Sequence, residues 1–538
     1  MHRIWLIMPL LYLTALPLSA QPLPGDINGD GTVNDADITR GVEIALGQPP
    51  APSQNELDAA DLNGDGLVTV QDLVLLANTI AGGNRPPVAD AGASPESGLA
   101  GTAIQLDATR SFDLDDDALR YRWRQLHMDR FSTEYVTENE VMLSDSMSAT
   151  PVFTPEWPGK YRFELEVADA PGLVERDTVD VLVGKDGVRQ LDVKGIEFVD
   201  VFGELGGPSF DLMPDDPDSM AAVLGRAMDG AVRIGAEWIG IAPAFFYARI
   251  NPLPEIRPGP NGLSLTVESD YAAIVAAAKA KGLKVIHREQ WGDGIFPLRP
   301  GERDSLDVLM STSAAWWDQW FAELENYLLL HAEWAERYGV DVFDPYFWAD
   351  DTFRPDVYPQ YEARWRDVIA AVRDRYSGQI SMSLLGFNLD GLTFADALDV
   401  VHLMVFANSY PDALADIKNP TLEEIRSHSE AIFDDREARF GGGQIPVYFI
   451  FNASSADGQV SGDPIPPAPS DVDNREQVLY YEGFFQALED EAWVNGLISS
   501  VWAWFDELDR PGVFNDKLTE GPRNKPVEEA IKLWFSIY

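Results

Sequence analysis

The feature that most constrains the fold is an alternation of short apolar runs with longer helical patterns, which begins near Gln190. Apolar strands joined by helices are typical of a parallel sheet whose two faces are both covered. Eight such runs are present: VKGIEF, WIGIAP, KVIHRE, VDVFDP, ISMSLL, VVHLMVF, VYFIF and ISSVWAW. We therefore predict a (β/α)8 TIM barrel over residues 190–538. The alternative is an open doubly wound sheet, but no glycine-rich phosphate motif follows the first run.

Two copies of one loop motif precede this region, DINGDGTVNDAD at 26–37 and DLNGDGLVTVQD at 61–72. Each copy places side-chain oxygens at positions 1, 3, 5 and 12, glycine at position 6 and a backbone carbonyl at position 7. This is the spacing of a loop that surrounds Ca²⁺ with oxygen ligands. The predicted ligands of two calcium sites are Asp26, Asn28, Asp30, Thr32, Asp37, Asp61, Asn63, Asp65, Leu67 and Asp72.

The paired loops and the apolar helical segments that follow them resemble a type I dockerin, over residues 24–82. The resemblance implies a small all-α domain that folds with calcium and docks onto a cohesin-bearing scaffold protein. Positions 10 and 11 of the loops, which often carry recognition in dockerins, are Asp35-Ala36 in one copy and Val70-Gln71 in the other. Because the copies differ there, we do not expect two equivalent binding faces.

Between the loops and the barrel, short alternating runs such as TAIQLDA and GKYRFELEVAD are separated by turn residues. This pattern predicts a small antiparallel β-sandwich over residues 84–184. The stretches SFDLDDDALRYRW and FTPEWPGKYRFELEVAD resemble a PKD-type immunoglobulin-like module. Such modules serve as spacers or carbohydrate contacts.

The first residues, MHRIWLIMPLLYLTALPLSAQ, have the basic start, apolar run and small residues of a secretory signal, which we place at 1–20. No later apolar run is long enough for a membrane span. The 88 Asp and Glu against 40 Lys and Arg, a formal charge of -48, argue against nucleic acid and anionic membranes as partners. We therefore predict a secreted protein, extracellular or at the cell surface, without membrane insertion.

Polar and aromatic side chains follow several of the eight predicted strands, where the chemistry of a barrel lies. Flat aromatic faces stack on sugars, and acids and amides take sugar hydroxyls. This mixture indicates a polysaccharide or oligosaccharide substrate. The predicted substrate-binding residues are Tyr247, Trp291, Trp348, Asn408, Tyr410, Asn452 and Trp504.

The barrel segment resembles a clan-A glycoside hydrolase, on the stretches GAEWIGIAPAFFYARI, DYAAIVAAAKAKGLKVIHRE, VDVFDPYFW and SSVWAWFD. The similarity is strongest to the family-113 β-mannanases. Members of that family use one glutamate after strand 4 and one after strand 7. Here Phe347 or Trp348 stands at the first place and Phe451 at the second, so neither family glutamate has a counterpart.

Cleavage of a glycosidic bond generally needs two carboxylates that flank it. Asp350 is the first candidate, with Glu289 or Asp506 as the second carboxylate; a carboxyl beside Trp291 or Trp348 would have a raised pKa and suit a general acid. Asp344 is a rival that, directly after its strand, also suits a structural role.

Three functional hypotheses remain open at this point: a glycoside hydrolase with relocated carboxylates, an inactive hydrolase-like barrel that binds glycans, and a structural component of a dockerin–cohesin assembly. We expect no catalytic cofactor. The six histidines form no HExxH motif and no close pair beside an acid, which gives little support for catalytic zinc.

Overall fold

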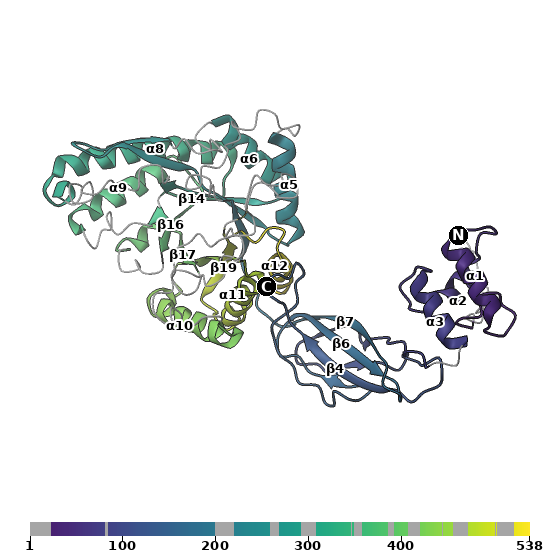
Figure 1. The fold of residues 1–538 in the computed structure, drawn as a ribbon. Helices are drawn as coiled ribbons and strands as arrows, with labels where there is room; N and C mark the ends of the chain where they lie inside the picture. The colour runs from purple at the N-terminus through teal and green to yellow at the C-terminus, as the bar shows by residue number, and fades with distance from the viewer. Residues whose placement is uncertain are drawn as a thin grey trace, which may run out of the picture.

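The computed structural model shows a helical part near the N-terminus, a β-sandwich and a large α/β part (Figure 1). It describes residues 23–80, 84–198, 220–258, 268–291, 308–345, 347–348, 358–385, 392–406, 420–443, 445–453, 455, 472–500, 502 and 521–538. The predicted signal at 1–20 lies outside these residues. None of the described helices is long and apolar enough to cross a membrane.

The N-terminal part consists of the helices α1 (Asp35–Ala45), α2 (Gln54–Ala60) and α3 (Val70–Ile80), as predicted for an all-α domain. Asn34 caps α1, and Ser53 caps α2 with a capping box to Glu56. The core is small, because only Ile27, Ala60, Leu62 and Leu76 form its buried apolar cluster in the described residues.

Residues 84–184 fold as two sheets, with strand orders β1-β3-β5 and β2-β7-β6-β4. Strand β6 alternates buried and half-buried residues along its whole length, so one face packs on the core. The predicted sandwich is therefore present. Its strands are β1 (Gly92–Ser94), β2 (Ser97–Leu99), β3 (Ile104–Asp107), β4 (Arg120–Leu126), β5 (Val152–Phe153), β6 (Gly159–Ala168) and β7 (Val174–Gly184).

Eight parallel strands form a closed barrel in the ring order β8-β9-β12-β14-β16-β17-β18-β19, and β19 pairs with β8. This confirms the predicted (β/α)8 architecture and rules out the open sheet. The strands are β8 (Val193–Phe198), β9 (Trp238–Ile241), β12 (Lys284–Arg288), β14 (Val342–Asp344), β16 (Gln379–Leu385), β17 (Val400–Phe406), β18 (Val447–Asn452) and β19 (Val494–Ser499).

After the ring strands β9, β12 and β14 the chain continues into short additional strands, which form a rim at the mouth of the barrel. The chain leaving β9 forms β10 (Ala244–Arg249), which pairs with β11 (Glu255–Pro258) and with β13 (Gln290–Trp291). The chain leaving β14 forms β15 (Phe347–Trp348), which pairs with β16. These short strands carry several of the predicted substrate-binding positions.

Helices surround the barrel (Figure 1). Apolar side chains that point outward from the strands pack against them; the ring of Phe451, for example, stacks on Phe484 of α11 at a centroid distance of 4.1 Å. The helices are α5 (Met220–Arg233), α6 (Glu268–Ala280), α8 (Ala314–Tyr338), α9 (Glu362–Arg373), α10 (Leu422–Phe440), α11 (Asn474–Leu488) and α12 (Pro526–Ile537), with short 3-10 turns η3 (Pro359–Tyr361) and η5 (Ala395–Ala397).

The sandwich packs against the barrel through the loop that follows β4. Tyr135 of this loop belongs to the hydrophobic cluster of the barrel. Glu482 of α11 is fully buried at the seam and accepts hydrogen bonds from the Tyr135 hydroxyl at 2.7 Å, the Thr137 hydroxyl at 2.7 Å and the Glu138 backbone N–H at 3.2 Å. The sandwich is thus joined to the barrel by a buried polar contact, which a simple spacer would not need.

Candidate active site at the mouth of the barrel

The direction of each side chain follows from the alternation of residues along a strand. One set of strand residues forms a buried cluster separate from the one that packs on the helices, and this set fills the inside of the barrel. Its members are Val193, Trp238, Ile286, Val342, Val400, Met404, Tyr448, Ile450 and Ile498. Residues an even number of positions further along these strands therefore also point toward the barrel axis, and the last of them on each strand lies nearest the mouth.

The first polar contact near the mouth is an ion pair between the ends of β8 and β12. Arg288 donates from Nε to Glu197 Oε1 at 2.5 Å, and the Ser500 hydroxyl donates to Glu197 Oε2 at 2.8 Å. Both charged side chains are almost fully buried. Because a buried charge is costly without a partner, this pair holds β8 and β12 in a fixed relation beneath the mouth.

Asp344 forms a second polar group at the end of β14. Its Oδ2 accepts from the Ser383 hydroxyl at 2.6 Å and lies 3.2 Å from His402 Nδ1. All three side chains are fully buried. These contacts suit the structural role that the sequence offered for Asp344 as an alternative to catalysis.

Strand β18 offers no carboxylate, since its six residues read VYFIFN. Phe451 points outward onto α11, so it does not face the barrel axis. The inward place at the end of this strand belongs to Asn452, two residues after Ile450. Asn452 is buried and pairs in register with Phe406 of β17. An amide therefore stands where this strand reaches the mouth.

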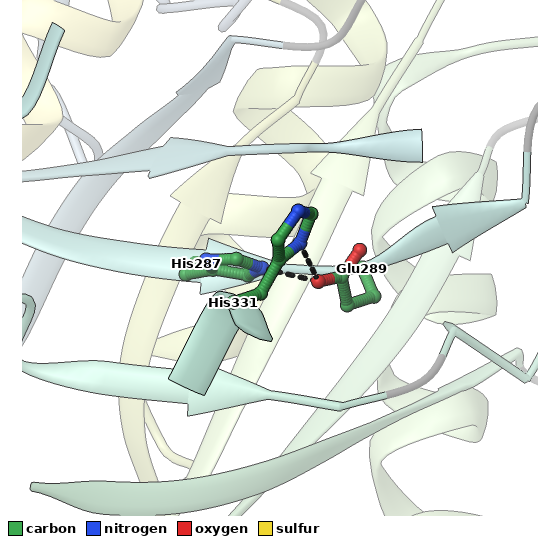
Figure 2. A group of neighbouring side chains, drawn as sticks. All are labelled: His287, Glu289 and His331. Carbon is green, nitrogen blue, oxygen red and sulfur yellow. Dashed lines mark hydrogen bonds and ion pairs between the residues drawn. The ribbon is translucent and has the colours of Figure 1, made fainter. Parts of the chain in front are cut away.

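Glu289, a predicted catalytic residue, has its side chain on the helix side of the strands, next to His287 and His331 (Figure 2). Its Oε1 is 2.7 Å from His287 Nε2 and 2.5 Å from His331 Nδ1, and its Oε2 accepts from the Tyr327 hydroxyl at 3.0 Å. His331 and Tyr327 belong to α8, so this carboxylate faces the helices. We expected it to converge with other acids over the mouth, and this placement differs from that expectation.

The electrostatics of this cluster favour an ionised carboxylate. Burial acts to raise the pKa of Glu289, but His331 and His287 beside it hold that pKa down to about 2. Burial lowers the pKa of His287, whose Nδ1 lies 2.8 Å from the Tyr271 hydroxyl. The Glu289 carboxylate is thus held ionised and has no proton to give to a leaving group.

The sequence showed no close histidine pair beside an acid, yet the fold assembles one from His287 and His331. The donor atoms lie within 4.8 Å of one another and suit zinc by type. Two ligands of one tetrahedral zinc ion, however, stay about 3.3 Å apart. Here the nitrogens lie 2.7 Å and 2.5 Å from the carboxylate oxygen. These are hydrogen-bond lengths, and hydrogen bonding accounts for the cluster.

The other predicted site residues are less fully described. Tyr247, Trp291 and Trp348 lie in the rim strands β10, β13 and β15, where only their backbone is described. Asp350, Asp506, Asn408, Tyr410 and Trp504 lie outside the described residues. Glu197 and Arg288 form a buried pair that the sequence did not predict; strand parity alone would have shown that both point inward.

The two predicted calcium loops have the backbone shape that a bound cation requires. Gly31 and Gly66 have φ angles of +87° and +79°, which a side chain would strain. Asp37 and Asp72 are buried acids whose Oδ1 atoms accept backbone N–H groups of their own loops, from Asn28 at 3.0 Å and from Asn63 at 3.1 Å. Each loop thus folds around its last acid, and its set of carboxylate, amide and carbonyl oxygens is of the type that Ca²⁺ prefers.

Two parts of the chain match the sequence models of known protein families. Residues 262–512 match the sequence model of Glycoside Hydrolase Family 113, and residues 24–81 match that of the Dockerin type I domain. The protein is therefore a modular, polysaccharide-active enzyme of the glycoside hydrolase class. The part that matches family 113 contains the barrel strands from β12 to β19, and the part that matches the type I dockerin contains helices α1 to α3.

A search of curated proteins finds none similar to this chain. Among solved structures, a GH113 β-1,4-mannanase in a complex is 20% identical, with a TM-score of 0.46, 65% of this chain covered and 100% of that chain. A GH113 β-mannanase from Alicyclobacillus acidocaldarius, solved with ManMIm, gives 20% identity, a TM-score of 0.46 and coverages of 65% and 98%. A family 5 mannosidase from Rhizomucor miehei gives 10% identity, a TM-score of 0.45 and coverages of 68% and 95%.

Proposed function

We propose that the barrel hydrolyses a mannan-type polysaccharide, using carboxylates from strand ends other than β18. The observation that carries the proposal is the family 113 match over residues 262–512, which spans the barrel from β12 to β19. Because β18 carries no carboxylate, we assign the catalytic pair to the ends of other strands. The mannan substrate rests on the family alone.

Asp350 and Asp506 are the proposed catalytic pair. Asp350 follows the rim strand β15 by two residues, and Asp506 follows β19 by seven. Both therefore come from the carboxyl ends of barrel strands, where reacting groups gather in this fold. One would protonate the leaving oxygen, and the other would act as nucleophile or as base toward water. Glu289 is left out of the pair, because its carboxylate faces α8.

The rim and the mouth would bind the sugar. We propose that Tyr247, Trp291, Trp348, Tyr410 and Trp504 offer stacking faces and that Asn408 and Asn452 take hydroxyl groups. The Glu197–Arg288 pair and the contacts of Asp344 fix the described ends of β8, β12 and β14. A rigid base of this kind keeps the reacting groups in place.

The N-terminal modules supply the proposed setting for this activity. Calcium bound in the two loops would complete the dockerin fold, and the dockerin would attach the enzyme to a cohesin-bearing scaffold. Secretion through the signal at 1–20, and a PKD-type identity for the sandwich, remain part of the proposal.

The outcome that would oppose this proposal is a barrel that binds glycans without cleaving them, and the lack of a carboxylate on β18 is the reason to test for it. Release of reducing sugar from a panel of β-mannans, glucans and xylans by the full chain separates the two. Hydrolysis of a mannan supports the proposal. Retention of a polysaccharide in affinity electrophoresis, with no product after long incubation, would establish the binding-only barrel.

A further inference from the structure

We propose that Glu289 is a positioning residue, which sets the position of the three-stranded sheet β11-β10-β13, the rim sheet, through its contacts with α8. The inference rests on the proposed function, because it assigns this rim to substrate binding. The starting observation is the place of Glu289 in the chain. It is the first residue after β12, and the next two residues leave the ring to form β13.

The backbone at Glu289 marks the point where two sheets separate. Its N–H donates to the carbonyl of Asp344 at 2.9 Å, so it still belongs to the barrel side. Gln290 and Trp291 then pair with Ala244 and Phe245 of β10. A shift of the Glu289 backbone would therefore move β13 directly.

The side chain of Glu289 is held to α8 at both carboxylate oxygens. His331 lies 2.5 Å from Oε1, and the Tyr327 hydroxyl donates to Oε2 at 3.0 Å. His287, on the preceding strand, adds a contact of 2.7 Å to Oε1 (Figure 2). With all of these groups buried, the carboxylate has no other partner among the described residues and fixes the strand end to the helix.

Helix α8 also holds the other strands of the rim sheet. The ring of Tyr327 meets Phe245 of β10 edge to face at 5.3 Å between centroids. Trp316 donates from Nε1 to the carbonyl of Ile250, at 2.8 Å, beside the turn between β10 and β11. One helix thus supports β10, β11 and, through Glu289, β13. The contacts of Glu289 with α8 therefore help to fix the sheet that carries Tyr247 and Trp291 relative to this helix.

A positioning role and a catalytic role predict different kinetics. Loss of a positioned rim weakens binding of substrate and transition state alike, so KM rises while kcat changes little. For Glu289→Gln we expect KM for the polysaccharide to rise about tenfold, with kcat within about threefold of the wild type. Loss of a general acid or base would instead lower kcat by about 10² to 10⁴-fold.

A direct readout of the rim keeps the test independent of turnover. The full chain, which contains 15 tryptophans, is labelled with 5-fluorotryptophan, and the Trp291 resonance is assigned with Trp291→Phe. Glu289→Gln and the milder Tyr327→Phe should each shift or broaden that resonance. Tyr376→Phe, which removes a buried hydroxyl bonded to the Val340 carbonyl, is the matched control and should leave it unchanged.

The outcomes separate the inference from the function on which it rests. A raised KM, or weaker retention in affinity electrophoresis if no glycan is cleaved, together with a perturbed Trp291 resonance supports the positioning role. A collapse of kcat at unchanged KM would make Glu289 catalytic and overturn it. An unchanged Trp291 resonance in both variants would also overturn it. Absence of hydrolysis in the wild type would defeat only the proposed function.

Discussion

The calcium loops and the barrel mouth place their functional groups in opposite ways. Each calcium loop draws all its predicted ligands from one stretch of chain, Asp26–Asp37 or Asp61–Asp72. The mouth draws its polar groups from strands that are far apart in the sequence. Ser500 and Glu197, which share a 2.8 Å hydrogen bond, are 303 residues apart. A local site depends on its ion and its loop, whereas a distributed site depends on the whole fold being closed.

Removal of calcium should show the difference between the local and the distributed site most clearly. The dockerin domain has a small apolar core, and the loop acids repel one another without an ion, so we expect EDTA to unfold this domain completely. The barrel should keep its transition, because its core is large and its predicted site needs no metal. Calorimetry of the full chain should show loss of the smaller transition alone, restored by excess Ca²⁺. A barrel transition that moved by more than a few degrees would contradict the separation.

Disruption of one buried ion pair should show how far the barrel depends on its distributed contacts. Arg288→Met leaves Glu197 buried without its cation, so we expect a loss of about 3–5 kcal/mol in the free energy of unfolding. The double variant Glu197→Gln with Arg288→Met removes both charges and should recover most of this loss. Denaturant unfolding measures all three proteins. Equal stability of the single and double variants would mean that the pair is not coupled.

The free energy of unfolding should depend on pH because of Glu482, at the contact between the sandwich and the barrel. Burial raises the pKa of Glu482 to about 7, from 4.5. A carboxyl whose pKa is higher in the folded state holds its proton more tightly there, so its stabilisation is present below about pH 4.5 and is lost as pH rises through about 7. The loss amounts to about 3 kcal/mol.

Glu482→Gln should flatten this dependence, because an amide cannot ionise. The measurement is the free energy of unfolding from pH 5 to pH 8 for the wild type, for Glu482→Gln and for the half-exposed control Glu430→Gln. The control should keep the wild-type slope. If Glu482→Gln keeps it as well, the carboxyl is not the group that titrates at the seam.

The smallest expected effect concerns the amide on β18. Asn452→Ala should weaken glycan binding by about tenfold, the cost of one lost hydrogen bond to a buried partner. Affinity electrophoresis with a soluble mannan measures this. Phe451→Leu, one residue away but facing α11, is the matched control and should alter stability without altering affinity. Equal affinities for wild type and Asn452→Ala would remove Asn452 from the sugar site.

The sequence predicted the parts of the molecule whose signals are local or periodic. Loop spacing identified the dockerin, and eight apolar runs predicted a barrel that the ring of strands confirms. The direction of single side chains was harder. Glu289 follows a strand and so suggested the mouth, but strand parity places it with His287 on the helix side. Its partner His331 lies 42 residues further on, a contact that only the packing of α8 creates.

The central claim is that Asp350 and Asp506 perform the hydrolysis, and initial rates test it most directly. Asp350→Asn and Asp506→Asn should each lower kcat on the best mannan substrate by at least about 10²-fold. Asp374→Asn, at the exposed C-terminal end of α9, which leads into the start of β16 and so lies away from the mouth, is the matched control and should retain the wild-type rate. Wild-type rates in either catalytic variant would contradict the claim and send the search for the carboxylates to other strand ends.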